Sequence, residues 1–144
     1  MKVRTPADFC KDRETLLDPA VRTVISIAGV EEQKQGGFNV LGATEPELKC
    51  GPGVDNDGYF EVNLPLGPYY LAPDAKIHLL TYDEKATQGT WQAAPASVAT
   101  LREVVKACKT GEQPSKPYTC GGNLFHATVN KNGVITDLTA VFQS

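Results

Sequence analysis

The amino-acid sequence predicts an α+β fold, with one or two helices packed on an antiparallel sheet of five or six strands and two disulfides. Short apolar–polar alternations separated by turn residues occur before residue 82 and after residue 123. One stretch near residue 100 has helical periodicity, and four cysteines lie far apart in the chain. The length of 144 residues fits a single domain, 1–144, with a sizeable core.

The N-terminal stretch is predicted to be helical over about residues 6–28. Thr5 suits the N-cap and Pro6 the first helical position. After a break at Asp18-Pro19, apolar residues recur at helical spacing, at Val21, Val24, Ile25 and Ala28. Because most of these side chains are β-branched, a buried strand is a close alternative for this second part.

Strands and hairpins are predicted over about residues 36–82. The candidate strands are Gly37–Leu41, Glu47–Cys50, Tyr59–Leu64 and Lys76–Tyr82. A tight turn is expected at 54–58, where Gly58 follows polar residues. Pro65–Asp74 contains three prolines, which interrupt a strand ladder, so an exposed loop is expected there. Lys85–Pro95 is expected to form a second irregular loop.

A helix over about residues 98–109 is the clearest prediction of regular structure. Val98, Leu101, Val105 and Cys108 share one helical face, and Gly111 provides a C-terminal stop. The C-terminal segment is predicted to be a hairpin over about residues 123–142 that turns at Asn132-Gly133.

The cysteines favour disulfides over metal ligation. Zinc and iron–sulfur ligands occur as closely spaced pairs, but Cys10, Cys50, Cys108 and Cys120 include no C-x-x-C pair. Four cysteines allow three pairings, and Cys108–Cys120 with Cys10–Cys50 is favoured because glycine and prolines turn the chain between residues 109 and 119. On chain-entropy grounds, closing the shorter loop, Cys108–Cys120, would contribute about 2.7 kcal/mol to stability. Closing the longer loop, Cys10–Cys50, would contribute about 3.9 kcal/mol. This cysteine usage indicates an oxidising, extracellular compartment.

Composition excludes several classes of protein. The net charge is −3, so general nucleic-acid binding is not expected. No apolar run approaches the roughly 18 residues that span a bilayer. Residues 1–6 are charged with no apolar stretch behind them, so a secreted form is expected to have lost its signal peptide. Residues 41–75 hold six acids and one base, an excess that an ordinary solvated face would explain.

Catalytic evidence in the sequence is sparse. No nucleophile motif occurs, and residues 53–58 fail the calcium-loop pattern because Gly53 falls at the first ligand position, so neither metal nor cofactor is expected. The alternative to a non-enzymatic role is a small secreted ribonuclease-like enzyme that cleaves phosphodiesters. Its base, acid and cation would be Glu61 or His78, His126 and Arg102. Both histidines alternate with apolar neighbours, so each is expected to face away from the core.

Aromatic residues in the two predicted loops suggest binding. Tyr69, Tyr70 and Trp91 lie there, where exposed rings commonly contact partners, although packing under the loops would also explain them. The favoured function is therefore a secreted binding module, an effector or extracellular recognition protein, with a protein or carbohydrate partner. A further alternative is an enzyme inhibitor that uses the stiff stretch Leu66–Tyr69.

Overall fold

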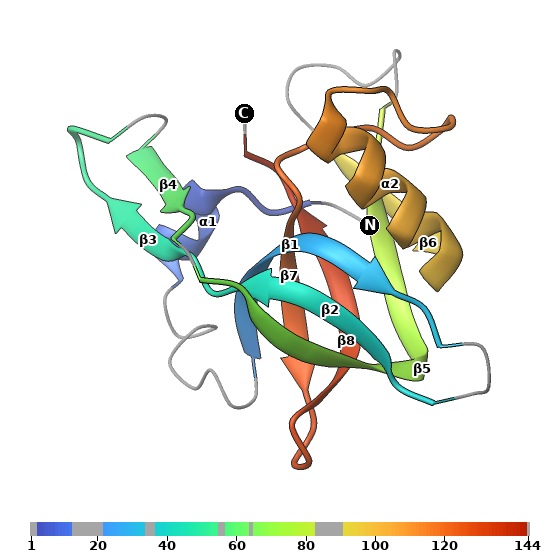
Figure 1. The fold of residues 1–144 in the computed structure, drawn as a ribbon. Helices are drawn as coiled ribbons and strands as arrows, with labels where there is room; N and C mark the ends of the chain where they lie inside the picture. Colours follow the sequence, from blue (N-terminus) through green and yellow to red (C-terminus); the bar gives the residue numbers. More distant parts are fainter. Residues whose placement is uncertain are drawn as a thin grey trace.

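The computed structural model describes residues 3–12, 22–33, 37–54, 57–63, 65–82 and 91–143. Two helices and eight strands lie within these ranges (Figure 1). In chain order the elements are α1 (Pro6–Lys11), β1 (Arg22–Glu31), β2 (Asn39–Thr44), β3 (Glu47–Cys50), β4 (Gly58–Glu61), β5 (Gly67–Thr81), β6 (Gln92–Ala96), α2 (Val98–Thr110), β7 (Leu124–Val129) and β8 (Val134–Val141). None of the helices in these ranges is long and apolar enough to cross a lipid bilayer.

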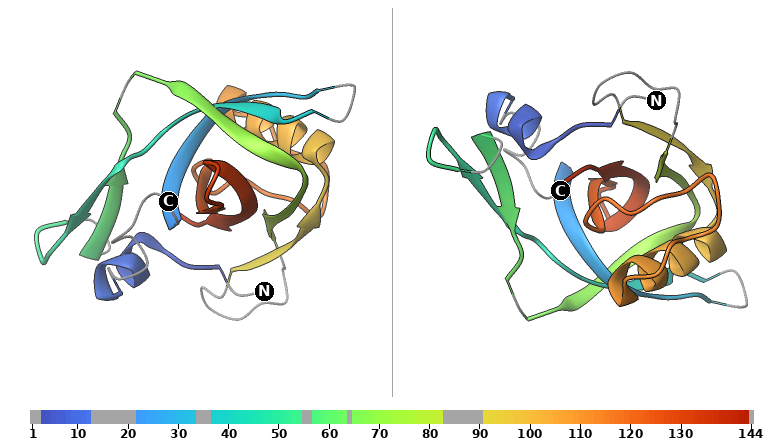
Figure 2. Two further views of the ribbon diagram at one scale, coloured as in Figure 1. Left: turned by 90° about the horizontal axis from the view of Figure 1, so that it is seen from below. Right: turned by 90° about the horizontal axis from the view of Figure 1, so that it is seen from above.

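Five strands close into a barrel. The main sheet has the order β2-β1-β7-β8-β5-β6, and β2 also pairs with β5, which joins the two sides of the ring. Strand β6 extends the sheet from β5, and β3 pairs with β4 in a separate two-stranded sheet. The end-on views in Figure 2 show α1, β3 and β4 on one side of the barrel, and α2 with β6 on another.

The expectation of a wholly antiparallel sheet is wrong at one pair of strands. β5 and β8 run parallel, and the other pairings of the barrel are antiparallel. The reason is parity, because strand directions cannot alternate all the way round a closed ring with an odd number of members. The α+β class with two helices and two disulfides is confirmed, and the main sheet is mixed.

The connectivity of the barrel is that of the OB-fold, a five-stranded Greek-key barrel. In chain order the barrel strands are β1, β2, β5, β7 and β8. Around the ring their order is first, second, third, fifth, fourth, and the third and fifth are the parallel pair. Helix α2 lies between the third and fourth strands in the sequence.

The prediction of helix over residues 6–28 holds for residues 6–11 and is wrong over residues 22–28. Helix α1 begins after its N-cap Thr5 and ends at Lys11, and residues 22–31 form β1. Ile25 faces the barrel core, and Val24 packs in a second cluster outside the barrel. Because both faces of β1 are buried, its sequence lacks the apolar–polar alternation of a half-exposed strand. Its apolar residues therefore recur at a spacing that resembles one face of a helix. Asp18-Pro19 lies outside the described residues.

The prediction of an exposed loop over Pro65–Asp74 is also wrong, since β5 begins at Gly67. Pro68 pairs with Gly42 of β2. Because proline has no N–H, this pair belongs to the non-hydrogen-bonded type, where nothing is lost from the ladder. Pro73 falls between Leu71 and Lys76, where the register between β5 and β8 shifts. Both prolines therefore occupy positions that a strand tolerates.

The second predicted loop, Lys85–Pro95, also includes part of a strand. Residues 83–90 lie outside the described residues, and Gln92–Ala96 form β6. β6 is at the edge of the main sheet, where its Pro95 is tolerated.

Helix α2 contributes apolar side chains to the main core. Ser97 caps α2 by accepting a hydrogen bond from the Thr100 N–H, and Gly111 ends the helix at a φ of 80°. Leu101, Val104 and Val105 of α2 join the core inside the barrel. The largest fully buried side chains of that core are Ile25, Ile27, Leu41, Leu71, Leu79, Leu101, Ile135, Leu138 and Val105.

The α1–β4 lobe, made of α1, β3 and β4, packs on the outside of the barrel (Figure 1). Phe9 of α1 and Phe60 of β4, whose ring centroids are 5.7 Å apart, cover three apolar side chains of the barrel wall. These are Val24 of β1, Leu124 of β7 and Val141 of β8. The expected disulfide pairing is confirmed: Cys10–Cys50 joins α1 to β3, and Cys108–Cys120 ties α2 to the segment before β7.

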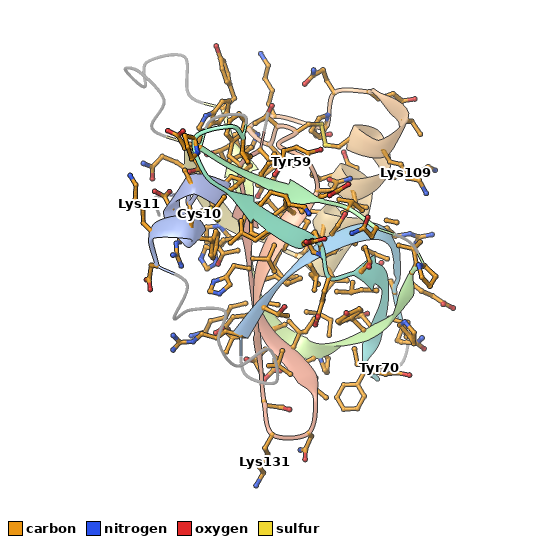
Figure 3. The ribbon with its side chains drawn as sticks, turned by 90° about the vertical axis from the view of Figure 1, so that its left-hand side faces the viewer. Cys10, Lys11, Tyr59, Tyr70, Lys109 and Lys131 are labelled. Atoms are coloured by element: carbon orange, nitrogen blue, oxygen red, sulfur yellow. A yellow bond between two sulfur atoms is a disulfide. The ribbon has the colours of Figure 1, made fainter. Side chains whose placement is uncertain are left out.

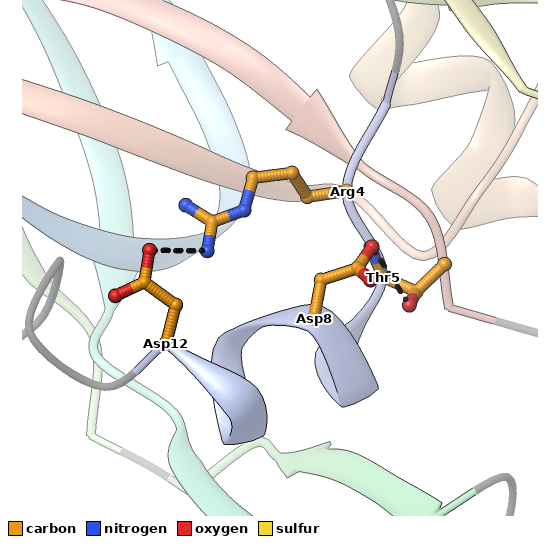
Figure 4. Close-up of polar contacts among 4 residues, drawn as sticks. All are labelled: Arg4, Thr5, Asp8 and Asp12. Atoms are coloured by element: carbon orange, nitrogen blue, oxygen red, sulfur yellow. Dashed lines mark hydrogen bonds and ion pairs between the residues drawn. The ribbon is translucent and has the colours of Figure 1, made fainter.

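Polar contacts complete the attachment of the lobe. The Gln143 side chain accepts from the Phe60 N–H at 2.7 Å and donates to the Phe60 carbonyl at 3.1 Å. Within α1, the Thr5 N–H donates to the Asp8 carboxylate at 2.8 Å, and Arg4 lies 3.7 Å from Asp12 (Figure 4). The lobe is thus held to the barrel by apolar packing and by a side chain from the end of the chain.

The close approach of α1 to β4 gives a first test. A Cβ at Gly58 would lie 2.7 Å from the Ala7 nitrogen, so Gly58→Ala is expected to lower the free energy of unfolding by about 2 kcal/mol. Gly42→Ala is the control, since its Cβ would meet nothing within 4 Å. Urea unfolding of both variants measures the difference. If Gly58→Ala is as stable as Gly42→Ala, α1 does not pack on β4 as described.

Candidate binding surface

The pairing of β2 with β5 brings exposed apolar side chains together on the outside of the barrel. Val40 is directly opposite Tyr70, so both point to the same face. This pair is two residues from Gly42–Pro68 and is likewise non-hydrogen-bonded, which places the Cα atoms about 4.5 Å apart. Tyr70 is 46% exposed, and Phe38, two residues before Val40, is 52% exposed. Figure 3 shows the Tyr70 ring projecting from the sheet into solvent.

A shallow hollow of about 440 Å³ lies on the same outer face. We call it the glycine groove. It is lined by Gly29, Val30, Glu31, Val40, Leu41, Gly42, Leu66, Gly67 and Pro68. Gly29 of β1 faces Gly42 of β2 across the ladder, and Gly67 is beside them. A Cβ at Gly29 or Gly42 would meet nothing within 4 Å, so the missing side chains of this outward-facing pair create the hollow.

Local sequence explains how the groove forms. Along β2, Leu41 and Ala43 point into the core, so Val40 and Gly42 point outward. A register shift in β1 between Ile27 and Gly29 places Gly29 opposite Gly42. The floor is the wall of the barrel itself, so the groove exists without rearrangement. A preformed site of this kind loses little conformational entropy when it binds.

The charges around the groove are unevenly placed. Glu31 pairs with Val40 and points to the same outer face. Burial, and secondly the charge of Glu45 just after β2, raise the pKa of the Tyr69 hydroxyl. At the other end of the groove, the Lys109 ammonium donates to the carbonyl of Ala28, next to Gly29, at 3.5 Å. The groove is therefore apolar along its length, with the Glu31 carboxylate at one end and both Lys109 and Glu45 near the other.

The three aromatic residues expected to bind do not form one surface. Tyr70 is exposed, but Tyr69 is half-buried against the main core. The Trp91 ring stacks on Phe142 at a centroid distance of 4.3 Å and lies 6.3 Å from the ring of Tyr82. Tyr82 follows the last residue of β5, and Tyr70 is near the first. Trp91 is thus at the opposite end of β5 from Tyr70, and much of its surface is used in packing.

Sequence reasoning missed the glycine groove and Phe38. The stretch Leu66–Tyr69, expected to be a stiff inhibitory loop, instead leads into β5 and supplies one wall of the groove. A local signal was present, since Phe38, Val40 and Gly42 alternate with inward-facing residues. The partner strand is about thirty residues away in the sequence, and nothing local indicates which strand it is.

A larger hollow of about 600 Å³ lies between Tyr82 and the loop that precedes β7. Its described lining includes Pro114, Lys116 and Tyr118. Tyr82 is followed directly by residues 83–90, which are outside the described residues. The glycine groove, whose strands are described on all sides, is the better-defined candidate.

The two histidines proposed for catalysis are brought to one face of the sheet. His126 of β7 and His78 of β5 each pair with Thr139 of β8, from opposite sides. Two strand spacings separate them, so their Cα atoms are about 10 Å apart. Glu61 is on β4, 3.7 Å from Lys49, and Arg102 is on the exposed side of α2. Among the described residues, no hydrogen bond or ion pair connects Glu61 or Arg102 to either histidine.

His126 has an environment that suits packing better than proton transfer. Its ring meets the Phe9 ring edge-to-face at 5.3 Å, and its buried Nε2 has no hydrogen-bond partner among the described residues. The Arg4 guanidinium lies 4.0 Å from the Phe9 ring centroid (Figure 4 shows Arg4 beside α1). Burial, and then the charges of Arg4 and Arg22, lower the pKa of His126 to about 4. The imidazole is therefore neutral at neutral pH.

This environment makes stability depend on pH. Above pH 6.5 His126 is neutral in both states, and between pH 6.5 and about 4 only the unfolded chain takes up its proton. After allowance for partial solvent exposure, His126 is expected to cost about 2 kcal/mol of unfolding free energy as the pH falls through this range. Urea unfolding of the protein and of His126→Gln at pH 7 and pH 4 measures it. An equal loss in both proteins would contradict the buried, neutral imidazole.

Comparison with protein-family models, with curated proteins and with solved structures finds no match to this chain. The fold and the candidate surface define the protein as a disulfide-stabilised five-stranded barrel with a preformed apolar groove on its outer wall. Among the described residues, no group of three or more His, Cys, Asp and Glu side chains is placed to hold a metal ion.

Proposed function

We propose that this protein is an extracellular binding module, an effector or recognition protein, whose contact surface is the glycine groove with Tyr70 and Phe38. The observation that carries the proposal is the exposed Tyr70 ring beside an open apolar groove. Tyrosine is among the residues that contribute most to binding at interfaces. Apolar patches left open on a small protein commonly mark interaction sites.

The chemistry of the groove supports binding over catalysis. Glu31 is the one titratable side chain among the described residues that line it. General acid–base catalysis usually needs a second group that holds or supplies the proton, and the histidines face a different part of the barrel wall. The groove offers shape and apolar area, which are the properties of a recognition surface.

The position of the groove in the barrel supports the same proposal by analogy. OB barrels bind oligonucleotides and oligosaccharides on the face of their second and third strands. Those strands are β2 and β5 in this protein. The analogy supports the place of binding and says nothing about the ligand.

Two disulfides support an extracellular location. All cysteines of the chain are paired, through Cys10–Cys50 and Cys108–Cys120. Disulfides of this kind persist in oxidising compartments and are rare in the cytosol. Partners are therefore best sought among secreted molecules and the outer surfaces of cells.

The proposal predicts that Tyr70 is a binding hot spot. Arrays of secreted proteins, cell-surface proteins and glycans are probed with the oxidised protein, and the Kd of each hit is measured. Tyr70→Ala is expected to raise the Kd about thirty-fold, the effect of losing about 2 kcal/mol of binding free energy.

Tyr59→Ala is the matched control, because Tyr59 of β4 is 39% exposed and belongs to the α1–β4 lobe. Circular dichroism confirms that both variants are folded. Hits that weaken in Tyr59→Ala and not in Tyr70→Ala would place the contact surface on the lobe and refute the proposal.

A further inference from the structure

On the basis of the proposed function, we infer that the glycine groove binds a polypeptide segment in which an apolar side chain is next to a basic one. The apolar side chain occupies the space above Gly29 and Gly42. The neighbouring lysine or arginine lies at the Glu31 end of the groove, within reach of the Tyr70 ring.

The lining of the groove favours an apolar group over a sugar. Its outward-facing side chains are Val40, Leu66, Pro68 and Glu31. Most hydroxyl groups of a saccharide held here would lose their contacts with water and face apolar side chains instead. Burying polar groups without hydrogen bonds is unfavourable. An aromatic or branched aliphatic side chain has no such requirement and fills the space left by the glycines.

The floor of the groove has a gap where two facing residues lack side chains. Gly29 and Gly42 form a single facing pair, and the next residues along the same face of β2 are Val40 and Thr44. The gap is therefore bordered by side chains along the strand. Such a gap accepts one inserted side chain of a segment that crosses the surface.

The charges determine which end of the groove receives a cation. Glu31 points outward beside Val40, and Val40 is opposite Tyr70. A cation at this end gains an ion pair with Glu31 and a contact with the face of an exposed aromatic ring. At the other end, the positive charge of Lys109 offsets the negative charge of Glu45 just after β2, so this end does not attract a cation as the Glu31 end does. The groove thus favours a segment with a basic residue on the Glu31 side of its apolar residue.

The same charges disfavour nucleic acid. A phosphate backbone along β2 would approach Glu31 at one end of the groove and Glu45 just after the strand. Phosphate binding depends on clustered lysine and arginine, and Lys109 is the one such side chain described next to the groove.

A random library of displayed 12-residue peptides, selected on the immobilised oxidised protein, tests the inference. Selected peptides are expected to share an aromatic or branched aliphatic residue within two positions of lysine or arginine. Their affinities are then measured with synthetic peptides by fluorescence anisotropy.

Three variants identify the contacts. Gly42→Leu fills the groove without touching other atoms at its Cβ, and is expected to weaken binding at least thirty-fold. Glu31→Lys is expected to change the selected residue from lysine or arginine to aspartate or glutamate. Gly53→Leu is the control, because its Cβ also meets open space but lies in the turn between β3 and β4, and it should leave affinity unchanged.

The possible failures separate the two proposals. Gly42→Leu could abolish binding while the selected peptides lack the basic residue, or keep it when selected on Glu31→Lys. In either case the inferred partner is wrong and the proposed binding surface stands. Glycans that bind in a Gly42-dependent manner, with no peptide doing so, would overturn the polypeptide partner alone. Peptides whose binding is unaffected by both Gly42→Leu and Tyr70→Ala would overturn the partner and the proposed function together.

Discussion

The hydrogen-bonded pairing of β2 with β5 is the interaction on which the rest of the structure depends. Without it the main sheet would be an open, curled ribbon with β2 as an exposed edge. With it the sheet becomes a ring of five strands, and the odd number requires at least one parallel pair, which is β5–β8. The same contact places Val40 beside Tyr70 and brings Pro68 to the rim of the glycine groove. Closure of the barrel and the candidate binding surface are therefore two consequences of one strand pairing.

The apolar side chains on the outer wall of the barrel are covered on one side and exposed on the other. Where β1, β7 and β8 point apolar side chains outward, the chain covers them with Phe9 and Phe60 of the α1–β4 lobe. The Cys10–Cys50 disulfide joins α1 to β3 within that cover, and the Gln143 side chain holds the cover on the barrel. On the β2–β5 side, Leu66 and Tyr70 remain about half exposed, and no described segment covers them. One apolar face of the barrel is thus covered by a helix and a hairpin, whereas no described segment covers the other.

Sequence reasoning succeeded where signals are local. Caps and periodicity predicted α2, the Asn132-Gly133 turn predicted the C-terminal hairpin, and the turn residues before Cys120 favoured the observed disulfide pairing. It failed where two distant segments decide the outcome. β1 imitated a helix because both its faces are buried, and the prolines of β5 indicated a loop because their non-hydrogen-bonded positions depend on β2. The candidate site shares this origin: Tyr70 could be singled out as an aromatic residue, but its neighbours in the groove could not.

Amide hydrogen exchange at β2 tests the central claim most directly. Leu41 pairs with Tyr69 in the register that exchanges both hydrogen bonds, because the adjacent pair contains Pro68. In a closed barrel, the Leu41 amide is expected to exchange as slowly as amides in the β7–β8 ladder, through opening of the whole domain. Exchange of Leu41 as fast as that of the exposed turn at Asn130–Gly133 would show that β2 is not held by β5. The barrel would then be open, and the glycine groove would not exist in solution.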